Sequence, residues 1–535
     1  MRALLSTYDK TGVVDLARGL ADAGWDLVSS GGTAKAVAEA GIAVTDVADL
    51  TGAPAILGHR VMTLHPMVHG GLLADRGDPA HQADMDEHGI VGIDLLVSNL
   101  YPFGSDPADF EHGGNAGAVD LIDIGGPAMI RAGAKNHAHV AVVVDPADYE
   151  PVLAEIRADG AVSAATRLRL AAKAFATTAA YDTAVAAWFA DELTGAKAHS
   201  DADADADTDT GDAEADPLPA ALRIDAARQP IALRYGENPH QRAALYRTAG
   251  ADPWWAQLTQ HSGLALSYLN LYDADAAWLL AHDLAQATGQ VACAIIKHAN
   301  PCGAAVADTA AEAYQRAFDC DPRSAFGGIV ALSEPIDPDT VERMVAAAQA
   351  DVVIAPGYGE GVVDALVAKR KRTRLLEAPA PTPDPLHVRP VTGGYLVQEP
   401  HRFVTPAADW RVVTERIPTA EELADAALAF RICGWVKSNS IVLVKDGVAW
   451  GIGAGQQNRV EAGQIATAKA AGRAEGGACA SDAFYPFPDG VEAAAEAGVA
   501  VVVQPGGSVK DDEIVATADR LGLAMLFTGE RHFLH

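Results

Sequence analysis

The sequence predicts an α/β protein built from two units. Short apolar, β-branched segments alternate with helix-like segments along most of the 535 residues. One acidic run, SDADADADTDTGDAEAD at residues 200–216, interrupts this alternation. The length suffices for several domains, each with a sizeable core.

The first unit is expected over residues 1–195 and alternates strand-like with helix-like segments. The expected strands are 2–8, 25–29, 95–98 and 139–144. The expected helices are 13–23, 34–40, 127–135 and a long Ala-rich stretch at 162–193. This βαβα order predicts a parallel, doubly wound sheet.

Residues 196–220 form the expected boundary. Their like charges repel one another and they offer almost no apolar surface to bury, so we interpret them as an extended linker. Residues 221–535 return to α/β alternation. Proline becomes frequent near 375–410, where we expect this second region to divide into two subdomains. No short-period repeat indicates a solenoid.

The charge balance excludes some partners. The chain has 40 Lys and Arg against 71 Asp and Glu, a net charge of −31. Such a surface repels nucleic-acid phosphates and anionic lipids, so neither nucleic acid nor membrane is an expected partner. The short basic run 369–374 is interpreted as a solvated loop. Only 12 of the basic residues are Lys, and this scarcity favours the hypothesis of a halophilic source.

The five cysteines contain no C-x-x-C pair, a pattern that fits a reduced cytosol better than a disulfide scaffold. The N-terminal apolar run is too short for a signal peptide. No apolar stretch approaches the roughly 18 residues that a membrane span needs. A cytoplasmic protein is expected.

Two loops of the first unit suit a phosphate. Ser29-Ser30-Gly31-Gly32-Thr33 follows the second strand, and we expect Thr33 to cap a helix that begins at Ala34. Residues 6–12 follow the first strand and should open at the same edge of the sheet. The alternative for a Gly-Gly turn is an ordinary connector.

Two further segments carry polar groups toward the same edge. Residues 60–66 (RVMTLHP) bring a guanidinium and a hydroxyl close together, although a surface turn explains them equally well. Residues 122–127 (IDIGGP) lead into a helix on which Arg131 and Lys135 share a face. Cations in a last helical turn also serve simply to complement the helix dipole.

The second region contains the segment KHANPCG at residues 297–303. Lys297 and His298 stand where a buried strand ends, and an Asn-Pro-Cys-Gly turn is expected directly after them. Lys donates to a developing oxyanion while neutral His takes a proton, which are the requirements of acyl transfer to an amine. The competing interpretation is a solvated strand end. A zinc-deaminase site is rejected because the second thiolate and the general-acid Glu are missing.

Other polar, glycine-rich strings favour a site that binds amides and a phosphate. They are LRYGENPHQ at 233–241, SAFGG at 324–328, SNS at 438–440, GIGAGQQNR at 451–459 and SDAFYPF at 481–487. The glycines at 451–455 do not have the spacing of a dinucleotide fingerprint.

Taken together, KHANPCG, RYGENPHQ, GIGAGQQNR and SDAFYPFPDG resemble the bifunctional purine biosynthesis family that joins AICAR formyltransferase to IMP cyclohydrolase. The resemblance covers nearly the whole chain. It implies an N-terminal methylglyoxal-synthase-like domain and a C-terminal pair of cytidine-deaminase-like subdomains without zinc. It also implies 10-formyltetrahydrofolate as co-substrate, no metal for the chemistry, and a homodimer. The small-molecule partners would be AICAR, formyl-AICAR and IMP.

The resemblance assigns roles in both units. In the formyltransferase, His298 matches the position of the family's catalytic base and Lys297 that of its electrostatic partner. Asn439 matches the residue that orients the formyl group. The AICAR- and folate-binding positions would be Arg234, Tyr235, Gly327, Asp351, Arg459, Val460, Phe484, Asp489, Ser508, Val509 and Arg531. In the cyclohydrolase, Lys135 matches the proton-transfer residue. The IMP- and formyl-AICAR-binding positions would be Tyr8, Asp9, Lys10, Ser30, Gly31, Gly32, Thr33, Arg60, Thr63, Ser98, Asn99, Tyr101, Asp123 and Ile124.

One position departs from the family pattern. Where the family has R-V-K-T-L-H-P, this chain has Met62, and a thioether cannot supply the expected cation. Two alternatives to a fully bifunctional enzyme therefore stay open. One is a formyltransferase with a weak or silent cyclohydrolase unit, and the other is a purine-nucleotide-binding regulatory protein.

Overall fold

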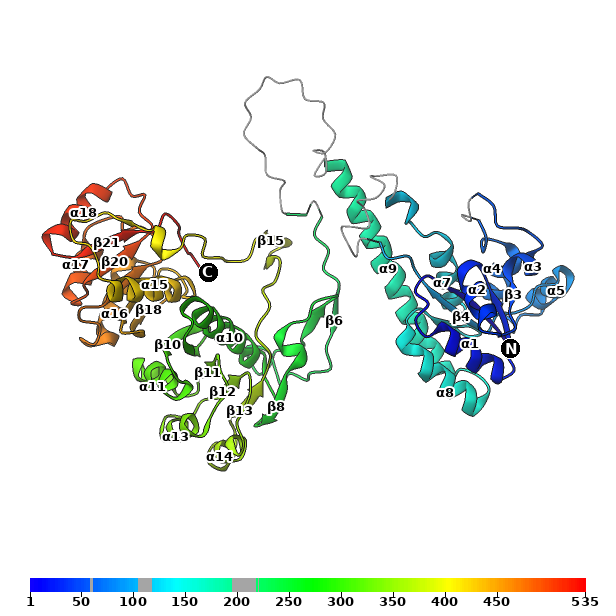
Figure 1. The fold of residues 1–535 in the computed structure, drawn as a ribbon, viewed down its shortest axis with the longest axis horizontal. Coiled ribbons are helices and arrows are strands. Elements are labelled where there is room, and N and C mark those ends of the chain that lie inside the picture. Colours follow the sequence, from blue (N-terminus) through cyan, green and yellow to red (C-terminus); the bar gives the residue numbers. More distant parts are fainter. Residues whose placement is uncertain (58–60, 104–117, 195–217, 220) are drawn as a thin grey trace, which may run out of the picture. The chain divides into compact units, whose positions relative to one another are not determined.

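The structure is a computed structural model that describes residues 1–57, 61–103, 118–194, 218–219 and 221–535. The expected linker therefore lies almost wholly outside the described residues. The chain divides into two compact units, Met1–Arg223 (unit 1) and Ile224–His535 (unit 2). Each unit has its own sheet and its own hydrophobic clusters (Figure 1).

Unit 1 is a doubly wound α/β fold. Its sheet has the order β3-β2-β1-β4-β5, and every neighbouring pair is parallel, which confirms the expectation. The strands are β1 (Arg2–Thr7), β2 (Asp26–Ser29), β3 (Thr45–Asp46), β4 (Leu95–Asn99) and β5 (Ala141–Val143). The helices are α1 (Val13–Asp22), α2 (Gly31–Glu39), α3 (Val47–Thr51), α4 (Pro66–Leu73), α5 (Pro79–His88), α7 (Gly125–Lys135), α8 (Tyr149–Asp159) and α9 (Ala164–Thr194).

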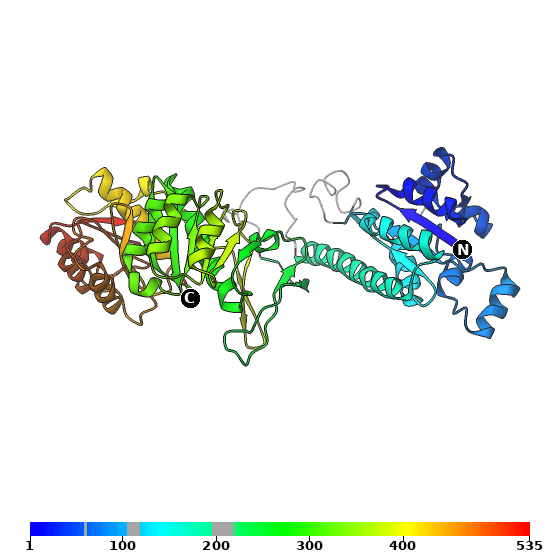
Figure 2. The ribbon, with the colours of Figure 1, turned by 90° about the horizontal axis from the view of Figure 1, so that it is seen from below.

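Alternate strand residues of unit 1 face opposite clusters. Leu5, for example, packs in the cluster of α1, α2 and α8, whereas Leu4 packs in the cluster of α4, α7 and α9. This alternation follows from the two-residue period of a strand and buries the sheet on both faces. The long helix α9 runs against α7 and β5 (Figure 2).

Unit 2 is organised around a twelve-stranded mixed sheet, ordered β16-β21-β20-β19-β17-β18-β10-β9-β11-β12-β13-β8. Its strands are β8 (Thr259–Ser262), β9 (Val291–Lys297), β10 (Asn300–Ala307), β11 (Ile329–Leu332), β12 (Val352–Ala355), β13 (Arg374–Glu377), β16 (Arg411–Val412), β17 (Ile441–Lys445), β18 (Val448–Gly453), β19 (Ala478–Ser481), β20 (Val501–Gln504) and β21 (Ala524–Phe527). Two two-stranded antiparallel sheets lie outside it, β6 (Ala226–Arg228) with β7 (Tyr246–Thr248), and β14 (His387–Val391) with β15 (Gly394–Gln398).

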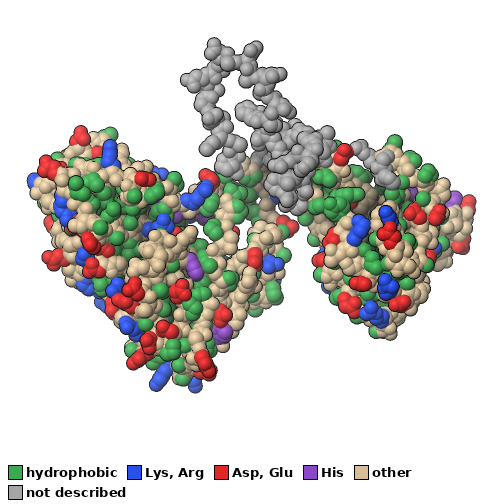
Figure 3. All heavy atoms as spheres, viewed as in Figure 1, with side chains coloured by type: hydrophobic (Ala, Val, Ile, Leu, Met, Phe, Trp, Pro, Cys, Tyr) green, Lys and Arg blue, Asp and Glu red, His purple; other side chains and the backbone are tan. Residues whose placement is uncertain are grey.

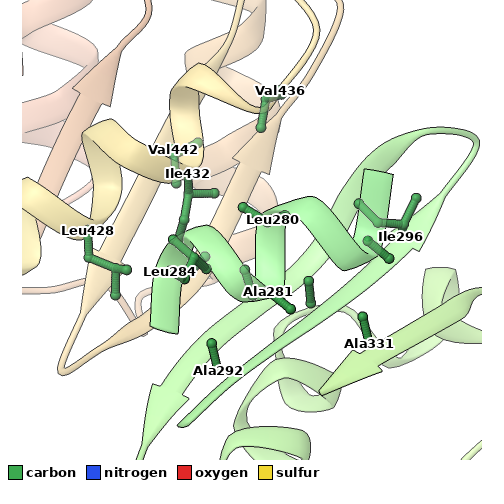
Figure 4. Packing of buried hydrophobic residues seen from close by; sticks show 14 of the residues in the cluster. Leu280, Ala281, Leu284, Ala292, Ile296, Ala331, Leu428, Ile432, Val436 and Val442 are labelled. Carbon is green, nitrogen blue, oxygen red and sulfur yellow. The ribbon is translucent and has the colours of Figure 1, made fainter. Parts of the chain in front are cut away.

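The helices of unit 2 cover both faces of this sheet. They are α10 (Tyr268–Thr288), α11 (Ala310–Cys320), α12 (Pro322–Ala325), α13 (Pro338–Ala346), α14 (Val362–Lys369), α15 (Ala420–Gly434), α16 (Arg459–Ala470), α17 (Asp489–Glu496) and α18 (Asp511–Arg520). Leu280 and Leu284 of α10 and Leu428 and Ile432 of α15 belong to one buried cluster (Figure 4). The remaining long helices pack on the opposite face.

The sheet contains an internal duplication. Residues 268–377 (the first half) and 420–527 (the second half) run through the same series, helix, β-hairpin, helix, strand, helix, strand, helix, strand, apart from the short helix α12. The halves meet where β10 pairs antiparallel with β18. Antiparallel joining turns one half over relative to the other, so matching ends of the two halves lie at opposite edges of the sheet.

Glycines allow one helix of each half to approach its hairpin closely. A methyl group on Gly303 of β10 would lie 2.0 Å from the Ala317 carbonyl oxygen, and one on Gly453 of β18 would lie 1.9 Å from that of Ala462. Neither position can hold a side chain. Gly451 and Gly453 of GIGAG therefore serve helix packing, as does Gly303 in KHANPCG.

Charged side chains are interspersed on the surface. On the face in Figure 3, Asp and Glu are spread over both units with Lys and Arg between them. Among the described residues, no helix is long and apolar enough to cross a membrane. All five cysteines are buried free thiols.

Candidate functional sites

In unit 1, the loop after β1 meets the start of α2. A methyl group on Gly32 would lie 3.4 Å from Cε and 3.6 Å from Nζ of Lys10, so the Lys10 ammonium lies over this glycine. The α2 N-terminus adds positive potential beside it. The structure thus brings Lys10 together with Ser30, Gly31 and Gly32, as the sequence suggested.

The expected helix start at Ala34 is wrong. Helix α2 begins at Gly31, and Ser30 is its extended N-cap residue. Thr33 lies inside the helix, where its buried Oγ1 accepts the Thr7 N–H at 3.1 Å and donates to the Thr7 carbonyl at 2.9 Å. Its hydroxyl therefore ties α2 to β1 and does not cap the helix.

Asn99 at the end of β4 fixes the loop after β1. Its Oδ1 accepts the N–H groups of Tyr8 at 2.6 Å and Asp9 at 3.0 Å, and its Nδ2 donates to the Asp9 carbonyl. The Tyr101 ring lies 4.8 Å from that of Tyr8. Tyr8, Asp9 and Asn99 line a cavity of about 460 Å³, and Ser98 is buried beside them in β4.

Two segments complete this edge of unit 1. Met62 Cε lies 3.8 Å from where a methyl group on Gly31 would stand, and Thr63 Oγ1 lies 2.9 Å from the corresponding point on Gly125. The thioether of Met62 thus lies beside the N-terminus of α2. Arg60 lies outside the described residues.

Asp123 precedes helix α7 at this edge. Burial raises the pKa of its carboxyl, and the N–H groups of Gly126, Tyr101 and Gly125 partly oppose that rise. Its Oδ1 accepts the Gly126 N–H at 2.8 Å, while Ile124 at the N-cap of α7 is exposed.

Lys135 stands apart from Asp123. It is in the last turn of α7, which begins at Gly125, so the two ends are separated by about 15 Å of helix at 1.5 Å per residue. Within one chain, Lys135 therefore lies toward the opposite edge of the sheet from Asp123 and Lys10.

In unit 2, Lys297 ends β9 and points at the loop before β11. Its Nζ donates to the carbonyls of Phe326 at 3.1 Å and Gly327 at 3.2 Å. A methyl group on Gly327, at φ +69°, would lie 3.1 Å from that Nζ and 3.9 Å from Asp351 Oδ1. Lys297, Gly327 and Asp351 thus converge at one edge of the sheet.

The turn expected at Asn-Pro-Cys-Gly is wrong. His298 and Ala299 form the turn, Asn300 opens β10, and β9 pairs antiparallel with both β10 and β11. The register of β10 against β9 shifts between Pro301 and Gly303. This shift accommodates Pro301, which has no N–H to donate to the neighbouring strand.

Arg374 was not expected at the site. The basic run 369–374, interpreted as a solvated loop, instead ends in this buried Arg at the start of β13. Arg374 donates to the carbonyls of Ala265 and Asp351. Burial and the neighbouring Arg234 lower its pKa. Arg234 itself lies over the Tyr235 ring at 5.2 Å, so a second guanidinium stands in the neighbourhood of Arg374.

A second cluster surrounds Asn439. Arg459 Nη2 donates to Asn439 Oδ1 and to Asp482 Oδ1, both at 2.8 Å. Asn439 Nδ2 donates to the Gln456 carbonyl at 3.0 Å. Asp482 is fully buried and was recognised in the sequence only as part of SDAFYPF.

Asn300 joins the two clusters. It follows the His298–Ala299 turn, and its Oδ1 accepts the Lys437 N–H at 3.0 Å, two residues before Asn439. The KHANPCG and SNS segments therefore lie side by side, although 130 or more residues separate them in the sequence.

The remaining predicted positions lie in the second half of unit 2 or directly after it. Val460 follows Arg459 in α16, Asp489 begins α17, and exposed Phe484 follows β19. Ser508 and fully exposed Val509 follow β20. Arg531 lies over the Phe533 ring at 4.4 Å, and its neighbour His532 donates its N–H to the Asp482 carbonyl at 3.0 Å.

Comparisons with known proteins agree across the chain. A family model described as "AICARFT/IMPCHase bienzyme" matches residues 133–469, and one described as "MGS-like domain" matches residues 12–128. The bifunctional purine biosynthesis protein PurH of Brucella abortus (strain S19) is 50% identical over 548 residues, covering 100% of this chain and 97% of that protein. Its counterpart in Brucella ovis is 49% identical over the same coverage.

A solved structure titled "Crystal structure of ForH" is 39% identical and covers 35% of this chain and 97% of its own, with a TM-score of 0.32.

The two units and these matches define a class, a bifunctional enzyme of purine biosynthesis with an MGS-like N-terminal domain. The chain belongs to the AICARFT/IMPCHase bienzyme family. The family resemblance found in the motifs is thereby confirmed. Among the residues that the structure describes, no cluster of three His, Cys, Asp or Glu side chains is arranged to hold a metal ion.

Proposed function

We propose that unit 2 transfers the formyl group and unit 1 closes the purine ring. In unit 2, the 5-amino group of AICAR attacks the formyl carbon of 10-formyltetrahydrofolate. The new C–N bond forms, the bond from the formyl carbon to N10 breaks, the amine loses a proton, and N10 takes up a proton as tetrahydrofolate leaves. In unit 1, the carboxamide nitrogen attacks the same formyl carbon, and water leaves to give IMP.

Lys297 is proposed to stabilise the oxyanion. An ammonium has three N–H donors, and two of those of Lys297 are taken by the carbonyls of Phe326 and Gly327. Those bonds fix the direction of the third, which serves the formyl oxygen as its negative charge develops. His298 in the adjoining turn is proposed to take the proton of the attacking amine.

Asn439 and Arg459 are proposed to orient the formyl group. Because Asn439 Oδ1 already accepts from Arg459 and its Nδ2 donates to Gln456, the amide plane is fixed before substrate binds. Arg234 and Tyr235, with Arg374 behind them, are proposed to bind the anionic part of AICAR. Gly327, Asp351, Val460, Phe484, Asp489, Ser508, Val509 and Arg531 complete the proposed AICAR and folate contacts.

In unit 1, Lys10 and the Ser30–Gly32 turn are proposed to hold the phosphate. Asp123 is proposed to exchange a proton with the ring-closing atoms, since a carboxyl with a raised pKa accepts and releases protons nearer neutral pH. Lys135 cannot reach this edge within its own chain. Its assignment as the proton-transfer residue therefore requires that a second copy supply it, and a homodimer is part of the proposal.

Unit 2 is proposed to contain two cytidine-deaminase-like subdomains that work without zinc. The duplication of helix, hairpin and strand series supports this, as does the absence of the second thiolate and the Glu at KHANPCG. The single observation that carries the proposed function as a whole is the match at 50% identity over the full chain.

Replacing Met62 by Lys tests whether the cyclohydrolase is weakened. An added ammonium near Gly31 attracts the phosphate, so we expect the KM for formyl-AICAR to fall by about fivefold, as one partly exposed charge pair gives roughly 1 kcal/mol. Met62→Gln, uncharged and of similar length, is the control. Both are assayed for IMP formation in high and low KCl.

The same assay separates the alternatives. Wild-type protein given AICAR and 10-formyltetrahydrofolate should yield IMP. Formyl-AICAR that accumulates and closes only at its spontaneous rate would show a silent cyclohydrolase. No turnover at any salt concentration would favour the regulatory protein.

A further inference from the structure

The two halves of unit 2 share a device that holds the hairpin turn. Helices α10 and α15 both begin with a capping box, Ser267 with Asn270 and Thr419 with Glu422. The sixth residue of each helix is an Asp, namely Asp273 in α10 and Asp425 in α15. Each carboxylate accepts hydrogen bonds from the backbone of its own half's turn.

In the second half this device is purely structural. Asp425 accepts the N–H of Asp446 on one oxygen and that of Gly447 on the other, both at 3.0 Å. These two residues, at φ +52° and +76°, are of the types that favour a two-residue hairpin turn. None of the residues assigned to the chemistry lies in this turn.

In the first half the same device holds the Lys-His segment. Asp273 Oδ1 accepts the Ala299 N–H at 2.8 Å, and the His298 N–H also faces this carboxylate. His298 and Ala299 adopt φ +57° and +55° without a glycine. An alanine in this region costs about 1 kcal/mol or more, so the turn relies on an outside partner to keep its shape.

Burial raises the pKa of Asp273, and the Ala299 N–H, the His298 N–H and the Lys297 ammonium act against that rise. A carboxylate that accepts two N–H groups binds them more strongly than a neutral acceptor does.

We propose that Asp273 is a positioning residue for formyl transfer, fixing the backbone of the His298–Ala299 turn so that the imidazole and the Lys297 ammonium present one geometry to the reacting atoms. This inference rests on the proposed role of His298. Asp425 holds the corresponding turn at the opposite edge of the sheet and provides a matched control.

The test compares Asp273→Asn with Asp425→Asn in the full chain. Asparagine keeps the shape of the side chain, but it removes the negative charge and replaces one of the two acceptor oxygens by an NH₂ group. For D273N we expect the formyltransferase kcat to fall about tenfold or more, with both KM values within about threefold. For D425N we expect kcat within about twofold of wild type, whatever its thermal stability.

A double variant separates positioning from folding. Glycine adopts positive φ without strain, so adding Ala299→Gly to D273N should restore part of the lost kcat. Cyclohydrolase activity with formyl-AICAR, measured on the same preparations, should stay unchanged and shows that the chain is intact. His298→Asn should abolish formyl transfer; an active H298N would overturn the proposed function itself.

Three outcomes would overturn the positioning role. They are a D273N enzyme with kcat within about twofold of wild type, equal kcat losses in D273N and D425N, and no recovery on adding A299G.

Discussion

Lowering the pH should destabilise unit 2 through one pair of buried imidazoles. His401 and His532 are in contact, with 2.7 Å between Nε2 of the first and Nδ1 of the second, among the rings of Phe403, Phe430 and Trp435. Burial, together with His532 and Arg431, lowers the pKa of His401 to about 4 from 6.5, against the opposing charge of Glu530. Burial also lowers the pKa of His532.

The sign and size follow from these values. The folded state keeps His401 neutral where the unfolded chain would take up a proton, so its contribution is complete above pH 6.5 and is lost as the pH falls toward 4. Between pH 7.5 and 5.0, the loss from this one group is about 2 kcal/mol of unfolding free energy.

The assay is urea unfolding at both pH values, followed by tryptophan emission, because six of the eight tryptophans are in unit 2. In His401→Gln, the side-chain amide nitrogen takes the place of the imidazole Nε2 beside His532, and the amide group does not titrate. The pH-dependent loss should then be smaller than in wild type by about 2 kcal/mol. His240→Gln, at an exposed histidine, is the control. Equal losses in wild type and H401Q would refute the reasoning.

Two further results are expected. If two copies share each cyclohydrolase site, mixing and re-equilibrating the inactive Lys135→Ala and Asp123→Asn dimers should restore about a quarter of the wild-type cyclohydrolase rate. Half of the dimers are then mixed, and each mixed dimer has one intact site of two. No recovery would mean that both residues act in a site formed by one chain. Gly327→Ala should lower the formyltransferase kcat about tenfold by displacing Lys297. Gly361→Ala, at a similar φ but in open space, should leave kcat unchanged and cost only about 1 kcal/mol of stability. Equal kcat in the two variants would contradict the contact between Gly327 and the Lys297 ammonium.

The local sequence pattern was enough to predict most helices and strands. It could not predict contacts between segments that are far apart in the sequence. The alternation of apolar segments located β4 to within one residue, at 95–98 against the observed Leu95–Asn99, and predicted the parallel sheet of unit 1. The His298–Ala299 turn was missed because neither residue is a usual turn former, whereas Asn-Pro-Cys-Gly looks like one. Nothing local could show that Asp273 faces that turn.

Two other residues illustrate the same limit. Arg374 sits in a basic run, and only the fold shows that it is buried against Ala265 and Asp351. The helix between Asp123 and Lys135 was expected, but both residues were assigned to one site, and only the structure places them at opposite ends of α7.

The pairing of β10 with β18 has a consequence for how unit 2 folds. Those strands lie at the centre of the twelve-stranded sheet but come from different halves, and one buried cluster contains residues of both α10 and α15. Either half made alone would expose an unpaired strand edge and the apolar face of a helix to water. Both features promote aggregation. During synthesis, the first half therefore keeps this apolar surface exposed until the second half has been made. We expect unit 2 to gain its stability in a single cooperative step once both halves are present.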